Sequence, residues 1–136
     1  MKFLAMIFAC LFFVSCNEQI DLSRDKDVEK ILSDGDWRVV EAEKPFTRFQ
    51  SGLKFSDNNQ VFMIDSQGQA IIPMQERLYE ISGDTLKIVD YRYEDRFIYS
   101  RGTEILLIEE LSNKKMVLNV IHPAGPNKLT LEKNPN

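Results

Sequence analysis

The chain has 136 residues, of which 43% are hydrophobic and 28% are charged, and its formal net charge is −4. This length allows one domain rather than two, and six Gly and five Pro are too few for a collagenous chain. The acidic balance argues against nucleic acid as a partner. One His and two Cys leave little material for a metal site or a thiol enzyme, so we expect no cofactor and no catalysis.

The first sixteen residues have the pattern of an export signal. Lys2 precedes thirteen uncharged residues, which as a helix span about 20 Å, less than the ~30 Å hydrocarbon core of a membrane. The segment Phe13-Val14-Ser15-Cys16 resembles the lipobox of bacterial lipoproteins, in which small residues precede a Cys that becomes acylated. An ordinary secretory signal with an incidental Cys16 is the alternative, and Cys10 is a rival cleavage point.

The lipobox resemblance implies a signal peptide over residues 1–15, a lipidated Cys16 with a tether over 16–24, and a folded domain over 25–136. Diacylglycerol on the Cys16 sulfur would anchor the protein to a membrane of the cell envelope, the outer membrane being favoured over the inner. Because Cys10 leaves with the signal and Cys16 carries lipid, the domain would contain no thiol, which excludes disulfides and thiolate metal sites.

The spacing predicts a short amphipathic helix over Asp25–Leu32, because Val28, Ile31 and Leu32 fall on one face. Acidic residues at its start and a lysine near its end suit the helix dipole. Gly35 can supply the left-handed stop that ends many helices. So short a helix needs another element to pack against.

From Trp37 onward the hydrophobic period changes to two, which is typical of strands. We expect strands over Trp37–Ala42, Leu53–Phe55, Val61–Ile64, Leu78–Ile81, Leu86–Val89, Phe97–Tyr99, Ile105–Ile108, Met116–Ile121 and Leu129–Leu131. Ser82-Gly83-Asp84-Thr85 is the clearest hairpin signal, and Gly102 is a candidate β-bulge. The pattern indicates an all-β barrel or sandwich. Its consecutive tight hairpins favour an up-and-down antiparallel barrel of about eight strands with one short N-terminal helix.

Gly35-Asp36-Trp37 matches the G-x-W of lipocalins at the entry to the first strand. The hairpin rhythm from Tyr79 to Ile88 and the short closing strand to Lys133 add to the match. The chain resembles the bacterial lipocalin-like domain lipoproteins over roughly residues 28–133. The resemblance implies that a short helix closes one end of the barrel, that the Trp packs there, and that a basic residue, Lys133 or Lys128, lies over the Trp.

Large apolar side chains at alternating strand positions are expected to line the barrel interior and any ligand cavity: Trp37, Phe55, Met63, Leu78, Ile88, Phe97, Leu107 and Leu118. A filled core and a ligand cavity use the same residue types, so both remain open. The first hypothesis is a non-enzymatic, lipid-anchored binding protein for a small, largely apolar ligand. The alternative is an envelope interaction protein with a filled barrel, which binds a protein or wall component through its loops or the Arg92–Arg101 hairpin.

The sequence offers few residues from which a catalytic site could be formed. His122 is the only His, so any His-dependent base or metal site would have to run through it. The adjacent carboxylates Glu109-Glu110 and Glu94-Asp95 would point to opposite faces of an extended strand, which keeps either pair from sharing a substrate. We therefore expect no enzyme and no metal site.

Overall fold

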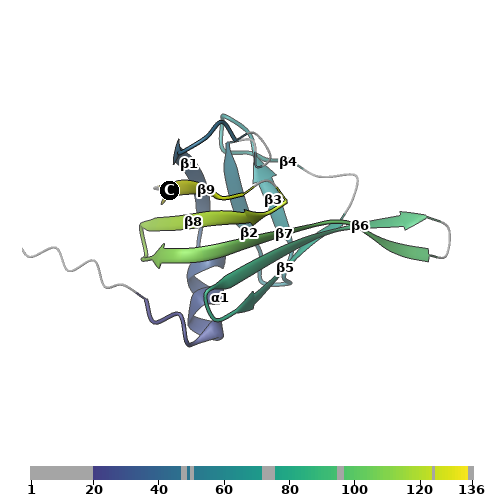
Figure 1. The fold of residues 1–136 in the computed structure, drawn as a ribbon, viewed down its shortest axis with the longest axis horizontal. Coiled ribbons are helices and arrows are strands. Elements are labelled where there is room, and N and C mark those ends of the chain that lie inside the picture. Colours follow the sequence, from purple (N-terminus) through teal and green to yellow (C-terminus); the bar gives the residue numbers. More distant parts are fainter. Residues whose placement is uncertain are drawn as a thin grey trace, which may run out of the picture.

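The structure is a computed structural model that describes residues 20–46, 49, 51–71, 76–94, 97–123 and 125–134. For residues 76, 91–94 and 97–101 it describes the backbone alone. The predicted signal peptide and Cys16 lie outside the described residues. In the described part, one short helix packs against a single antiparallel sheet of nine strands (Figure 1), which confirms the all-β prediction.

The elements follow one another as α1 (Asp25–Ser33), β1 (Asp36–Ala42), β2 (Gly52–Phe55), β3 (Val61–Ile64), β4 (Ala70–Ile71), β5 (Glu76–Ser82), β6 (Thr85–Glu94), β7 (Phe97–Leu111), β8 (Lys115–His122) and β9 (Asn127–Lys133). Their order in the sheet is β4-β3-β2-β1-β9-β8-β7-β6-β5. Each pairing in the sheet therefore joins two strands that are consecutive in the sequence, except that β1 pairs with β9.

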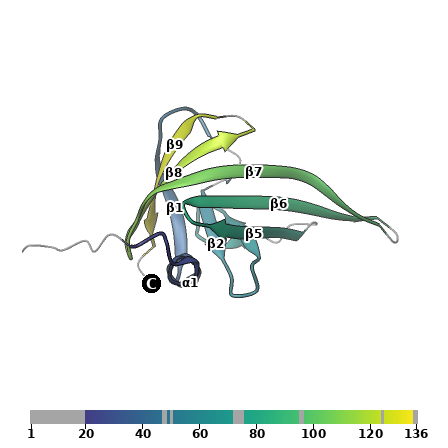
Figure 2. The same ribbon diagram turned by 60° about the horizontal axis from the view of Figure 1, so that its bottom comes forward.

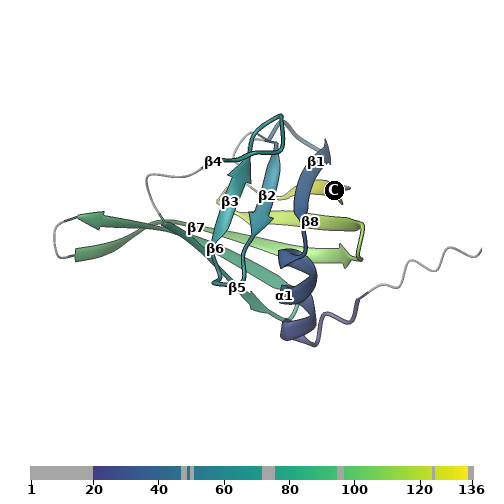
Figure 3. The ribbon, with the colours of Figure 1, turned by 180° about the vertical axis from the view of Figure 1, so that it is seen from behind.

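This sheet curls into a half-barrel (Figures 2 and 3). The pairing of β1 with β9 joins Trp37 to Lys133 and brings the two halves of the chain together. β4 and β5 are the two edges of the strand order. An isolated bridge between Gln60 and Leu78, with the Tyr79 amide donating to the Asn59 carbonyl at 2.8 Å, brings the β5 edge against the β2–β3 turn.

Local signals in the sequence account for most element boundaries. Ser82 pairs directly with Thr85 across a two-residue turn, and Gly83 there has φ +59°, the left-handed conformation that such hairpins require at their first central residue. The predicted bulge near Gly102 is confirmed by a register shift, since Asp90 pairs with Gly102 and Tyr91 with Ser100. The two short strands expected on either side of it are one long strand, β7.

Two further elements differ from the prediction. The helix extends one residue beyond Leu32, to Ser33, and is followed by Gly35 at φ +114°. The two-residue strand β4, which pairs with the end of β3, was not predicted because two residues carry no detectable period.

The core fills the concave side of the sheet and is closed at one end by α1. Val28 and Leu32 of the helix are wholly buried. Its other buried members come from every long strand of the sheet and one loop: Trp37, Phe49, Leu53, Phe55, Val61, Tyr79, Leu86, Ile88, Leu106, Ile108, Leu111, Met116, Leu118, Val120, Leu129 and Leu131. One hydrophobic core therefore serves the whole described chain.

Two of the residues expected to line the interior lie on the other face of the sheet. Tyr79 and Ile88 form a cross-strand pair inside the core, so their neighbour Leu78 points outward. Leu106 and Ile108 are buried in the core, so Leu107 between them also points outward. The strands were located correctly, but the phase of the alternation was wrong by one residue at both places.

Candidate functional site

The end of the half-barrel beside α1, which we call the helix end, is sealed by contacts around Trp37. The indole Nε1 donates a hydrogen bond of 3.0 Å to the Leu32 carbonyl. Above the indole, Lys133 Nζ lies 5.2 Å from the ring centroid and 3.3 Å from Asp34 Oδ2. Lys133, and not Lys128, is thus the basic residue over the Trp. Gly35 permits this approach, because a Cβ there would lie 3.3 Å from the Lys133 side chain.

Further hydrogen bonds hold the N-terminal segment to the same end. The Gly83 amide in the β5–β6 turn donates to Asp25 Oδ1 at 3.0 Å. The Ile20 amide donates to the Leu111 carbonyl at 3.0 Å, and the side chains of Ile20 and Leu22 pack against the core. These contacts fasten the helix as a plug, so the helix end has a structural role.

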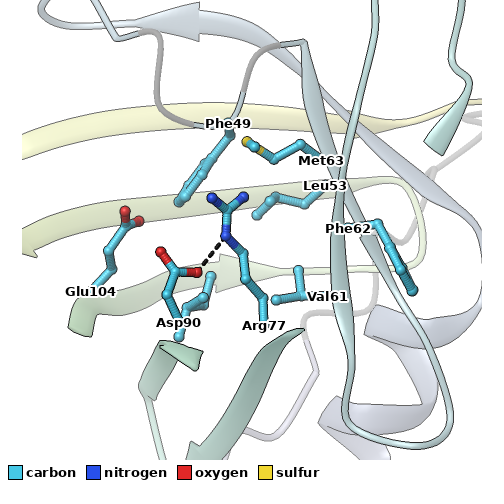
Figure 4. A pocket seen from close by; sticks show the side chains of 9 residues that line it. Phe49, Leu53, Val61, Phe62, Met63, Arg77, Asp90 and Glu104 are labelled. Carbon is cyan, nitrogen blue, oxygen red and sulfur yellow. Dashed lines mark hydrogen bonds and ion pairs between the residues drawn. The ribbon is translucent and has the colours of Figure 1, made fainter. Parts of the chain in front are cut away.

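Away from the helix lies a small interior pocket, which we call the mouth pocket (Figure 4). Its walls are mainly apolar and enclose three charged side chains: Phe49, Leu53, Val61, Phe62, Met63, Arg77, Ile88, Asp90 and Glu104. Arg77 on β5 and Asp90 on β6 are a direct cross-strand pair, and Arg77 Nε donates to Asp90 Oδ1. Both side chains are mostly buried, being 25% and 30% exposed. A charge-assisted bond of this kind offsets part of the cost of placing charges among apolar walls.

The free space in the mouth pocket is about 10 Å³, which is about the room that one water molecule needs. Pockets for small organic ligands usually measure about 300–1,000 Å³. The mouth pocket therefore admits an organic ligand only if some of its side chains move aside.

The residues predicted to line a ligand cavity are distributed over several environments. Trp37, Phe55, Ile88 and Leu118 are buried in the core, whereas Met63 and Ile88 are the two that reach the mouth pocket. The side chain of Phe97 and the whole of Cys16 lie outside the described residues. Of the seven predicted lining residues whose side chains the structure describes, two therefore line the interior pocket.

Three important members of the pocket were missed from the sequence. Arg77 is in phase with the buried Tyr79, and Asp90 is in phase with the buried Leu86 and Ile88. Charged residues in phase with a core face are the signal that could have revealed this pair. Phe49 stands in a polar loop between β1 and β2, and no periodicity indicated its burial.

Strands β6 and β7 continue beyond their neighbours as a two-stranded ribbon (Figures 1 and 2). Pairing of β5 with β6 reaches Tyr91, and pairing of β8 with β7 reaches Ile105. Beyond these points, the described residues of Arg92–Glu94 pair with Phe97–Tyr99 of the same hairpin. We call residues 91–101 the β6–β7 arm. Its described residues, 91–94 and 97–101, include those of the predicted Arg92–Arg101 hairpin and project away from the half-barrel.

The other candidate residues lie in ordinary surface surroundings. His122 is exposed at the end of β8. Glu109 accepts hydrogen bonds from Lys128 Nζ at 2.7 Å and from Asn119 Nδ2 at 3.1 Å. The bond from Lys128 lowers the pKa of the Glu109 carboxyl, and the same bond raises the pKa of the Lys128 amine. This is a surface ion pair between β7 and β9, on either side of β8, and exposed pairs of this kind contribute little to stability.

The outer side of α1 carries a groove of about 500 Å³ that is open to solvent and includes Asp21, Asp27, Lys30, Asp34 and Asn113 among its walls. Its walls are mostly charged or polar. Within the described ranges, no three His, Cys, Asp or Glu side chains come together as a metal-binding group. The same ranges contain no helix with the length and apolar character needed to cross a membrane.

Comparisons with protein-family models, with curated proteins and with solved structures found no match to this chain. The mouth pocket and the β6–β7 arm are therefore the features of this chain that bear most directly on its function.

Proposed function

We propose that this chain is a lipid-anchored, non-enzymatic cell-envelope protein whose lipocalin-like barrel is a packed scaffold that presents the β6–β7 arm to an acidic protein or wall component. The observation that carries this proposal is the continuation of β6 and β7 past the pairing limits of β5 and β8. The small free volume of the mouth pocket favours a packed scaffold over a carrier.

The contacts at the helix end support the lipocalin-like assignment. A helix plugs the barrel, Trp37 packs beneath it, and Lys133 lies over the indole ring. The pairing of the first strand with both β2 and the last strand is the connection that an up-and-down barrel needs. These features match what the G-x-W resemblance implies, from residues far apart in the sequence.

The sequence of the arm suits an acidic partner. Arg92, Arg96 and Arg101 alternate with Tyr and Phe residues, while Glu94 and Asp95 balance part of that charge. Arginine binds carboxylates through two parallel hydrogen bonds, and Arg, Tyr and Trp are the residue types most often found at interface hot spots. Among the described residues, the outer edges of this ribbon have no strand partner beyond Tyr91 and Ile105, and such edges can accept an added strand.

The test uses a photo-crosslinking amino acid at position 98 of the arm, in the full-length protein within intact cells. We expect a defined adduct, which Arg96→Glu should reduce several-fold because a negative charge replaces a positive one near an acidic partner. Lys87→Glu is the matched control, since Lys87 is half-exposed on the same strand but outside the arm. An adduct of undiminished yield in Arg96→Glu, or equal loss in both variants, would contradict the proposal.

The lipid anchor is tested separately. Mass spectrometry of the mature N-terminus should show cleavage before Cys16 and a mass increase from diacylglycerol and an acyl chain. Cys16→Ala should move the protein from the membrane fraction to the soluble fraction. An unmodified Cys16 would refute the anchor and leave the role of the arm unaffected.

Binding of a small, largely apolar ligand is the second candidate, and the charged pair inside the apolar mouth pocket favours it. A few polar groups within apolar walls are the usual composition of a ligand site. Native mass spectrometry of the protein purified from its own membrane should then show a retained small molecule of a few hundred daltons. Arg77→Met should lower its occupancy if Arg77 orients the ligand. Protein masses alone, in both variants, would favour the packed scaffold.

A further inference from the structure

The N-terminal segment joins the barrel very close to the predicted anchor. From Ile20 onward the chain is bound to the sheet, because the Ile20 amide donates to the Leu111 carbonyl and the Ile20 side chain packs against the core. Three residues separate Cys16 from Ile20. Covalent geometry limits the four steps between the two Cα atoms to about 14 Å, whatever their conformation.

We infer that the helix end is the membrane-facing side of the protein and that the β6–β7 arm ranges outward from the membrane. This inference rests on the proposed lipid anchor at Cys16. The short connection keeps α1 and the β7–β8 turn, residues 111–115, next to the lipid surface. The length of the connection is enough to set this orientation, so the orientation does not require a lipid-binding site on the described surface.

Distances along β7 place the other parts of the molecule relative to that surface. Glu104 in the mouth pocket lies seven residues from Leu111, about 23 Å at ~3.3 Å per residue. Phe97 at the start of β7 in the arm lies fourteen residues away, about 46 Å on the same basis. Figure 1 shows the arm projecting on the side opposite the described start of the chain. With the connecting segment added, the arm reaches up to about 60 Å from the membrane.

The described surface has no large apolar patch that would hold the side of the half-barrel against the membrane. Its large exposed hydrophobic residues are Val40 and Ile121, and they lie on different strands. Removal of the signal peptide takes away Lys2 and makes the chain more acidic than −4, so its net charge gives it no overall attraction to anionic lipid. In this orientation the arm can meet a partner that stands several nanometres from the membrane.

The same geometry decides how a ligand would arrive if the mouth pocket binds one. The pocket lies at a distance from the membrane-facing end, so its occupant comes through the aqueous phase or from a partner. Direct uptake from the anchoring bilayer is not expected.

Two labelled variants test the orientation. Asn113→Cys places a thiol in the β7–β8 turn, and His122→Cys places one at the far end of β8; both positions are exposed. Because Cys16 is acylated in the mature protein, only the new thiol takes a fluorophore. The lipidated protein is reconstituted into phosphatidylcholine vesicles that contain a lipid with a nitroxide headgroup. We expect at least twofold stronger quenching of the label at position 113.

Equal quenching at both positions, or stronger quenching at position 122, would overturn the inference. A second variant carries about 20 Gly and Ser residues inserted between Gln19 and Ile20, a linker with a mean reach of about 25 Å. If the short connection sets the orientation, the difference between the labels should shrink toward zero. A difference that persists would assign the orientation to a surface contact and also overturn the inference.

Vesicle flotation separates the two proposals. If the protein floats and the labels are quenched equally, the orientation is wrong while the anchor and the role of the arm stand. If the protein does not float and Cys16 carries no lipid, the anchor fails and the orientation fails with it.

Discussion

The two ends of the half-barrel are built in different ways. At the helix end, Trp37 is wholly buried, its indole nitrogen has a hydrogen-bond acceptor, and Lys133 covers its face. At the other end, a charged pair lies within apolar walls and a two-stranded ribbon leaves the sheet. If the β6–β7 arm binds a partner, as we propose, we expect substitutions at the helix end to affect folding stability more than substitutions in the arm.

This division suits a small barrel that has no thiol in its described residues and relies on its core. Loops and strand extensions at one end can vary while the other end holds the sheet in register. Substitutions at the helix end should therefore lower the free energy of unfolding and leave partner binding unchanged. Changes in the β6–β7 arm should do the opposite.

The largest effect is expected from Trp37→Ala. Removing a wholly buried indole leaves a cavity beneath α1 and also deletes the bond to the Leu32 carbonyl, so we expect a loss of about 3–5 kcal/mol in the free energy of unfolding. Urea denaturation followed by circular dichroism measures it. Val40→Ala on the same strand is the control: Val40 is 53% exposed and should cost less than about 0.5 kcal/mol. Similar costs for the two variants would contradict the stabilising role of the helix end.

Tyr79 predicts a loss of stability at high pH. Burial raises the pKa of its phenol from the ordinary value of 10.0 to about 12, with smaller contributions from Glu29 and Asp57. The folded state thus holds the phenol proton more tightly than the unfolded state, so this stabilisation is complete below pH 10 and disappears as the pH rises toward 12. The upper limit is about 2.7 kcal/mol, and partial hydration of the hydroxyl reduces it to about 1–2 kcal/mol.

Tyr79→Phe checks this directly, because Phe keeps the ring packing against Phe55 and loses the bond from the hydroxyl to the Ser56 carbonyl. The difference in unfolding free energy between the two proteins should narrow from pH 9 to pH 12. A difference that stays constant over this range would show that the phenol titrates normally.

Lys133→Met should have a smaller effect at the same end. Met keeps an aliphatic chain beside Gly35 and loses the cation over the indole, for which we expect a cost of about 0.5–1 kcal/mol. The ion pair with Asp34 contributes little, since Asp34 is 84% exposed. Lys133→Arg should retain most of the stability, because a guanidinium also stacks on an indole face. Loss of equal size in both variants would assign the effect to packing.

The sequence predicted the fold class well because its signals are local. The period of two located every long strand, although it divided β7 into two. Gly83 marked a hairpin through its left-handed conformation, and Gly102 marked the position of a bulge. Leu78 and Leu107 were assigned to the wrong face, since runs such as Ile105–Ile108 are apolar at every position and do not reveal the phase. Pairing with neighbouring strands settles that phase, and pairing is not local.

The candidate site was much less predictable than the fold. Lys133 could be named as a partner of Trp37 only through the resemblance, because the two residues are 96 positions apart in the chain. The pair of Arg77 and Asp90 depends on the register of β5 against β6. The continuation of β6 and β7 beyond the barrel depends on where β5 and β8 stop, and no pattern within the hairpin itself contains that information.

The smallest effect on stability is expected from shortening the arm. Replacing residues 92–99 with Asn-Gly makes Tyr91 and Ser100, already a cross-strand pair, the closing residues of a two-residue hairpin. The buried residues described on these strands all lie outside the deleted segment: Leu86, Ile88, Val89, Leu106, Ile108 and Leu111. We therefore expect the free energy of unfolding to change by less than about 0.5 kcal/mol.

This shortened variant allows the roles of the two ends in binding and in stability to be compared in one experiment. If the arm serves binding and the helix end serves stability, partner crosslinking from a residue beside the arm should vanish while the urea midpoint stays unchanged. Trp37→Ala should do the reverse in conditions where it remains folded, lowering the midpoint and keeping the adduct. A fall of more than about 2 kcal/mol in the shortened protein would be of the size seen when core packing is disturbed, and it would show that the arm belongs to the folding unit. The two ends would then differ in shape but not in their contribution to folding stability.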